Sequence, residues 1–149
     1  MKSADKNFNL VCIVLLALMG MLSAVHPPGP NPPGPTPIDE KLIEGDGLQM
    51  LVVFDREKDW HQLEPDQMDI FLDLNQAGEL RRWVDDNVND WEEISPHDPV
   101  EYVSDKWKNA MTKSPSTKVP WFIISGDKGS WAGTPKSIDE TMKMLKELK

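Results

Sequence analysis

The sequence predicts an α/β domain with a mixed four-stranded sheet and helices on both of its faces. Two short apolar runs rich in branched residues, 48–54 and 119–125, are typical of buried strands. Segments with apolar residues at helical spacing separate them, and a turn with two glycines follows the second run, as in a tight hairpin. The first two strands in chain order, 48–54 and a short strand at 91–95, are joined through helices and are expected to be parallel. The last two, 119–125 and 130–133, are expected to form an antiparallel hairpin, so the sheet is mixed.

The chain has 149 residues, which is enough for one ordinary domain with accessory segments. We divide it into an N-terminal segment over residues 1–25, a Pro/Gly-rich linker with a polar lead-in over residues 26–45, and one domain over residues 46–149.

The formal net charge is -9. Because such a surface repels a phosphate backbone and no stripe of Lys and Arg offsets it, we expect no nucleic-acid binding.

An apolar segment at residues 10–25 has no charged residue and follows lysines at positions 2 and 6. This pattern is typical of a targeting segment, expected to be helical. Its length lies between that of a secretory signal, about 7–15 apolar residues, and that of a membrane span, about 17–25. Both a cleaved signal peptide and a signal anchor therefore remain open. In either case the lysines favour a cytoplasmic N-terminus. The domain is expected to be exported, either membrane-anchored outside the cytoplasm or secreted or periplasmic.

A proline-rich tract at residues 26–37 reads HPPGPNPPGPTP and repeats the unit PPGP twice. Proline fixes φ and glycine resists regular structure, so the tract predicts an extended, semi-rigid polyproline spacer. We interpret it as a tether between the membrane and the domain. A ligand for an SH3-like or WW-like groove is the alternative.

The first helices of the domain follow the strand at 48–54 and a polar loop. Pro65 opens a helical stretch with Met68, Phe71 and Leu72 at i, i+3 and i+4 spacing. A second stretch, after a break near Gly78 or the preceding Asn75, places five apolar residues on one face: Ala77, Leu80, Trp83, Val84 and Val88.

A short edge strand is predicted at residues 91–95, which alternate weakly. Asp98 and Pro99 then start a helix that ends before Ser114 and Pro115. Its apolar residues at helical spacing are Val100, Val103, Trp107, Ala110 and Met111.

The C-terminal part of the domain supplies the hairpin and the last helix. After the strand at 119–125 and its glycine turn, residues 130–133 form a short return strand. Ser137 and Glu140 form a capping box that starts the final helix. The apolar stripe of this helix is Ile138, Met142, Leu145 and Leu148.

This order of elements, with Val119-Pro120 at the head of the third strand and a glycine hairpin before the last helix, resembles the thioredoxin fold. The resemblance covers residues 46–149 and implies a three-layer domain. In that family the proline at this point is cis and faces the redox motif, so the resemblance implies a cis bond between Val119 and Pro120. A trans proline that begins an edge strand is the alternative.

Thioredoxins carry a CxxC motif in the loop after the first strand, which corresponds here to residues 55–63, DREKDWHQL. The only cysteine of the chain is Cys12, in the apolar N-terminal segment. Disulfide exchange needs a thiolate. We therefore expect no oxidoreductase activity of the usual kind, and we assign no catalytic residue.

The resemblance also implies a cleft between this loop and the proline, where relatives hold an extended peptide against the backbone preceding the proline. The candidate binding residues are Trp60, His61, Val119, Pro120 and Trp121. Trp60 is the strongest signal, because an aromatic residue in a polar loop has no core stripe to join and aromatic residues anchor interfaces. A tryptophan folded back onto its own domain is the alternative.

No other class of site is indicated. The three histidines lie in different segments, and none has a second His or Cys at metal-ligand spacing, so we predict no metal site and no cofactor. We expect an exported, redox-inactive module that binds an unidentified protein or peptide. A non-thiol enzyme on the same scaffold and a structural spacer protein of a cell envelope or virus particle are the alternatives.

Overall fold

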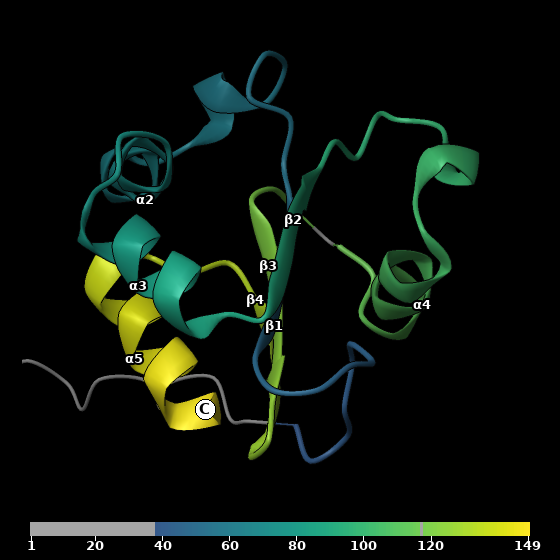
Figure 1. The fold of residues 1–149 in the computed structure, drawn as a ribbon. Coiled ribbons are helices and arrows are strands. Elements are labelled where there is room, and N and C mark those ends of the chain that lie inside the picture. Colours follow the sequence, from purple (N-terminus) through teal and green to yellow (C-terminus); the bar gives the residue numbers. More distant parts are fainter. Residues whose placement is uncertain (1–37, 117) are drawn as a thin grey trace, which may run out of the picture. The chain divides into compact units, whose positions relative to one another are not determined.

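The computed structural model describes residues 38–116 and 118–149 (Figure 1). The predicted apolar helix at 10–25 and the proline-rich tract at 26–37 lie outside the described residues. Among the residues that are described, no helix has both the length and the apolar character needed to cross a membrane.

Four strands form one sheet in the order β2-β1-β3-β4. The central strand β1 (Gln49–Val53) pairs in parallel with β2 (Asp90–Ile94) and antiparallel with β3 (Trp121–Gly126). β3 in turn pairs antiparallel with β4 (Gly129–Gly133). The predicted mixed four-stranded sheet, with a parallel first pair and a C-terminal hairpin, is confirmed.

Helices cover both faces of this sheet, as predicted. One side carries α2 (Pro65–Asn75), α3 (Glu79–Asn87) and α5 (Ile138–Leu148), and the other carries α4 (Asp105–Lys113), as Figure 1 shows. Two of the helix starts agree with the sequence: Pro65 occupies the first turn of α2, and the Ser137 hydroxyl accepts a hydrogen bond from the Glu140 amide at the start of α5.

The larger hydrophobic core lies between the sheet and α2, α3 and α5. Its centre is a group of three phenylalanines, each at most 1 % exposed. The ring of Phe71 stacks on Phe54 with 4.2 Å between centroids and lies 6.1 Å from Phe122. Phe71 belongs to α2, whereas the other two belong to the sheet or its immediate extension, so this group attaches the helix to the sheet.

A smaller core lies on the α4 side of the sheet. Alternate residues of β1 and β3 point to it, because successive side chains of a strand face opposite sides. Its buried residues come from the strands, from α4 and the segment just before it, and from the lead-in before β1. They are Leu42, Ile43, Leu51, Val53, Ile94, Val103, Trp107, Ala110 and Ile123.

The lead-in before β1 packs on the domain, so the packed unit begins further toward the N-terminus than the predicted boundary at residue 46. Leu42 and Ile43 are 4 % and 0 % exposed. Their backbone amides donate to the hydroxyls of Ser130 and Ser125, each over 2.9 Å. Two adjacent apolar residues among polar neighbours have no periodicity, which explains why the sequence pattern did not include them in the domain.

The helix predicted from Asp98 begins later than expected. A 3-10 turn, η2 (Val100–Tyr102), comes first, and α4 begins only at Asp105. Val103 and Ser104 between them have extended backbone, which lets Val103 reach the smaller core and makes Ser104 the N-cap of α4. Val100, predicted on the buried stripe, is 60 % exposed.

Two other apolar residues lie off the faces on which the periodicity placed them. Leu72 is 41 % exposed, because the buried stripe of α2 is made by Ile70, Phe71 and Leu74. Ala77 has a φ of 56° and lies in the turn between α2 and α3. The predicted break near Gly78 is confirmed, since Gly78 is the N-cap of α3.

Candidate functional site

Polar loops emerge side by side at the end of the sheet where β1 and β2 stop. Val53 and Ile94 are the last paired residues of these parallel strands, and the Phe54 amide extends the ladder by donating to the Ile94 carbonyl over 2.9 Å. Both strands run in the same direction, so the segments 55–63 and 95–98 leave the sheet at the same edge. Carboxyl ends of parallel strands are frequent ligand sites in α/β proteins.

Asp55 is the first residue of the loop at 55–63, and its carboxylate accepts hydrogen bonds from this loop and from the segment after β2. One carboxylate oxygen accepts hydrogen bonds from the amides of Glu57 and Lys58, at 2.9 and 3.0 Å. The other accepts from the Ser95 hydroxyl at 2.7 Å. Chiefly this Ser95 hydrogen bond, with a further contribution from the Lys58 amide, lowers the pKa of Asp55 to about 2.

Asp59 is the buried acid of the loop and is only 2 % exposed. Its Oδ2 accepts from the Asp55 amide over 3.1 Å, while its own amide donates to the Asp55 carbonyl over 2.7 Å. Its Oδ1 accepts from the side-chain amide of Gln62 and lies 3.1 Å from Nε2 of His97. Asp59 thereby holds the loop closed and joins it to the segment that follows β2.

A bidentate ion pair joins the loop at 55–63 to β2 on the solvent side. The Arg56 guanidinium donates to both carboxylate oxygens of Glu93, at 2.6 Å each, and also contacts the side chain of Asn75. The hydrogen bonding of Arg56 to the Glu93 carboxylate raises the pKa of Arg56. A shallow pocket of about 440 Å³ opens over this ion pair and the Asp55 carboxylate.

The Ser, His and Asp residues of this edge are not arranged for nucleophilic catalysis. The Ser95 hydroxyl donates to Asp55 and accepts from the backbone amide of His97, whereas the His97 ring faces Asp59. The hydroxyl thus has a carboxylate as its proton acceptor, and a carboxylate with a pKa of about 2 is a weak general base. The network joins the loop at 55–63 to the segment that follows β2.

We expect the stabilisation from Asp55 to disappear in acid. The folded-state pKa of Asp55, about 2, lies below the ordinary value of 3.8. The stabilisation from the ionised carboxylate is therefore complete above pH 3.8 and is lost as the pH falls through about 2. Asp55→Asn should therefore lower the free energy of unfolding near neutral pH, and its difference from the wild type should shrink between about pH 4 and pH 2. Urea unfolding at a series of pH values measures the difference in free energy of unfolding between Asp55→Asn and the wild type. A difference that stays constant from about pH 7 to about pH 2 would refute the lowered pKa of Asp55.

Three of the five predicted cleft residues pack against the two cores on opposite faces of the sheet. Trp60, in the 3-10 turn η1 (Trp60–Gln62), is partly buried and packs, like Val119, against the larger core. His61 is exposed. The Trp121 side chain packs against the smaller core instead. Neighbouring strand residues point to opposite faces, and Phe122 takes the face of the larger core.

The Val119–Pro120 peptide bond is cis, as the resemblance implied. Pro120 is buried, and its carbonyl accepts a hydrogen bond from the Thr134 hydroxyl over 2.7 Å. The backbone amide and carbonyl of Val119 make no hydrogen bond with any other described residue. Within residues 38–116 and 118–149, one donor and one acceptor immediately before β3, beside the end of β1, therefore have no partner.

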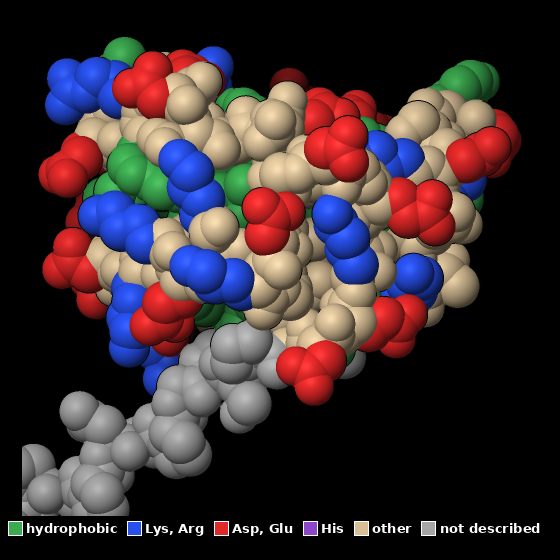
Figure 2. All heavy atoms as spheres, turned by 60° about the horizontal axis from the view of Figure 1, so that its bottom comes forward, with side chains coloured by type: hydrophobic (Ala, Val, Ile, Leu, Met, Phe, Trp, Pro, Cys, Tyr) green, Lys and Arg blue, Asp and Glu red, His purple; other side chains and the backbone are tan. Residues whose placement is uncertain are grey.

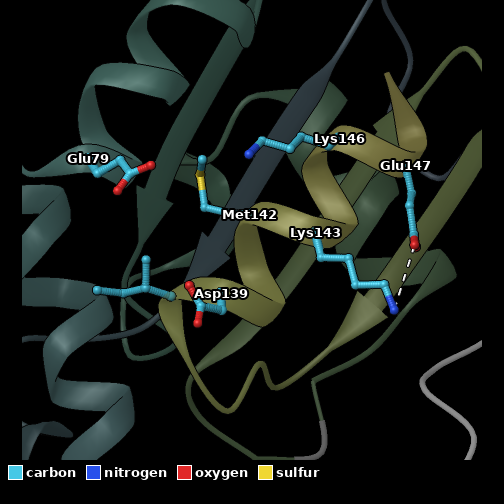
Figure 3. A pocket seen from close by; sticks show the side chains of 7 residues that line it. Glu79, Asp139, Met142, Lys143, Lys146 and Glu147 are labelled. Carbon is cyan, nitrogen blue, oxygen red and sulfur yellow. Dashed lines mark ion pairs between the residues drawn. The ribbon is translucent and has the colours of Figure 1, made fainter.

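A further pocket, of about 390 Å³, lies between α3 and α5 (Figure 3). Glu79 comes from α3, and the other labelled residues come from α5, where Lys143 and Glu147 pair at 3.7 Å. Ile138 and Met142 contribute its apolar part. Charges of both signs line this pocket, and Figure 2 shows the same mixture over the face that it displays. Its charged lining residues are Glu79, Asp139, Lys143, Lys146 and Glu147, so neither sign of charge prevails.

Within residues 38–116 and 118–149, no three His, Cys, Asp or Glu side chains come together in a way that could hold a metal ion. The fold and these sites define an α/β domain with a mixed sheet covered on both faces and a polar network at one edge. No protein-family model matches the chain, and comparisons with curated proteins and with solved structures give no match either.

Proposed function

We propose that the domain is thioredoxin-like, has no redox activity and binds an extended segment of a protein or peptide. The observation that carries this proposal is the backbone of Val119, whose amide and carbonyl have no partner among the described residues. An extended chain laid beside this position would exchange hydrogen bonds with both groups, as an added strand does at a sheet edge. Trp60 would supply the neighbouring aromatic surface.

The order of the strands supports the thioredoxin-like part of the proposal. A parallel pair joined by helices, followed by an antiparallel hairpin and a last helix, agrees with the resemblance found in the sequence. The resemblance implies a thiol pair in the loop after β1; in this chain Asp55 and Asp59 of that loop instead exchange hydrogen bonds. Cys12 is the only cysteine of the chain, so disulfide exchange through a cysteine pair within it is impossible.

We propose further that residues 10–25 bring the domain out of the cytoplasm and that residues 26–37 hold it at a distance from the membrane. The charge-free apolar run after two lysines and the repeated PPGP unit support this. The mass of the exported chain separates the two forms: a loss of about 25 residues marks a cleaved signal peptide, and the full mass marks an anchor.

A peptide-binding measurement tests the proposed function. Peptides are selected from a displayed random library against the full chain and then titrated in solution. Methylating one backbone nitrogen of the peptide at a time removes one donor without touching the protein. We expect one such position to lower affinity by about tenfold, the effect of one lost hydrogen bond.

Val119→Pro removes the corresponding donor of the protein and should weaken binding by about tenfold as well. Leu72→Ala, on the exposed side of α2, is the matched control and should bind like the wild type. Near-ultraviolet circular dichroism verifies that both variants are folded. Full affinity in Val119→Pro, or reduction of insulin by the wild-type chain, would each argue against the proposal.

A further inference from the structure

The surface around η2 presents the two most exposed large apolar side chains of the described residues. Tyr102 is 82 % exposed and Val100 is 60 % exposed. Asp98 and Glu101, beside them in the chain, are also exposed, and neither forms an ion pair with another described residue. We refer to Asp98, Val100, Glu101 and Tyr102 as the η2 surface.

The η2 surface is formed by a hydrogen-bonded turn. The Tyr102 amide donates to the Pro99 carbonyl over 3.1 Å, and the Val103 amide donates to the Val100 carbonyl over 3.2 Å. Val103, which follows directly, is only 9 % exposed and belongs to the smaller core. The two apolar side chains are therefore held outward by a turn that is itself anchored. A partner that covers them would not have to order a loose loop, and this lowers the entropic cost of binding.

The charge of the surrounding chain is strongly one-sided. Residues 85–105 contain eight Asp and Glu and no Lys or Arg. Four of these acids are neutralised by ion pairs with cations elsewhere in the chain: Asp85, Asp90, Glu93 and Asp105. Glu92 has no such ion pair and shares with Ile94 the face of β2 that points toward α4, because alternate strand residues face the same way. Glu92 is therefore the one acid of β2 without an ion pair to another described residue, and it adds to the unpaired charge of Asp98 and Glu101.

We propose that the η2 surface is a docking site for a segment of another protein that carries Arg or Lys beside an apolar side chain. Asp98 and Glu101 complement its positive charges. The face of the Tyr102 ring attracts a guanidinium or ammonium group, and Val100 offers apolar area for the neighbouring side chain. Tyrosine is also enriched among residues that dominate binding energy. This site is separate from the Val119 backbone and goes beyond the proposed function.

The test uses the full chain and a short fluorescent peptide that alternates Arg and Leu. A peptide of the same length with Gln in place of Arg is the comparison. We expect Tyr102→Ala to weaken binding of the Arg peptide by about tenfold, and Tyr102→Phe, which keeps the ring, to retain most of it. Asp98→Asn with Glu101→Gln should also weaken it by about tenfold and reduce its dependence on salt.

A control double variant has the same change of net charge as the η2 double variant, but at another part of the surface. It distinguishes binding at the η2 surface from general electrostatic attraction between the peptide and the acidic chain. Asp69→Asn with Asp86→Asn neutralises two exposed acids of α2 and α3, on the other side of the sheet. We expect it to bind the Arg peptide within about twofold of the wild type. The proposal is overturned if this control loses as much affinity as the η2 double variant, if Tyr102→Ala binds like the wild type, or if the Gln peptide binds as tightly as the Arg peptide.

Discussion

Phe71→Ala should lower the free energy of unfolding by about 3–5 kcal/mol. The Phe71 ring is fully buried, stacks on Phe54 at 4.2 Å and faces Phe122 at 6.1 Å. Its removal leaves a cavity between α2 and the sheet, lined by side chains that are themselves packed on other neighbours. Since a domain of this size is stable by about 5–15 kcal/mol, the loss would be a large part of the total.

Leu72→Ala is the matched control for this prediction, because Leu72 is the next residue of the same helix and is 41 % exposed. We expect it to cost less than about 1 kcal/mol. Urea unfolding followed by tryptophan fluorescence compares the two variants. Equal losses would mean that α2 does not bury the face on which the larger core depends.

Asp59→Ala should lower the free energy of unfolding by about 3 kcal/mol. The carboxylate is buried and accepts hydrogen bonds from the Asp55 amide and from the side chain of Gln62, with His97 at 3.1 Å. Its removal leaves these groups without their acceptor, and hydrogen bonds to a charged group are worth about 1.5–3 kcal/mol each without being additive. The loop at 55–63 would also lose its contact with His97 and would keep only the Asp55–Ser95 hydrogen bond to the segment after β2.

Glu57→Ala, in the same loop, removes an exposed carboxylate that makes no hydrogen bond or ion pair with another described residue. It should leave the stability within about 0.5 kcal/mol of the wild type. Hydrogen exchange of the Asp55 amide gives a second readout, since this amide donates to Asp59. Protection of that amide in Asp59→Ala at the wild-type level would show that the carboxylate does not close the loop.

The sheet was predictable because its signals are local. β1 and β3 are runs of branched apolar residues, and the hairpin is marked by its glycines. The start of α4 was not predictable in the same way. Val100 and Val103 fit one helical stripe, yet the packing of Val103 in the smaller core and the extended Ser104 interrupt the helix between them.

The polar network could not be recognised as a unit from the sequence. Asp55 and Asp59 are two acids among many, and only the pairing of β1 with β2 brings Ser95 and His97 to them. The available signal was that polar residues directly follow both parallel strands and so meet at one edge. The face of Trp121 was predictable, because strict alternation with the buried Phe122 sends it to the opposite side of the sheet.

The binding of an extended peptide at the head of β3 is tested most directly by the amide NMR signal of Val119 in the labelled full chain. On addition of a selected peptide to saturation, we expect this signal to shift and its hydrogen exchange to slow, because the amide gains an acceptor, and we expect the Trp60 indole signal to change with it. A saturating peptide that leaves the Val119 amide unshifted and its exchange unchanged would contradict the proposed function.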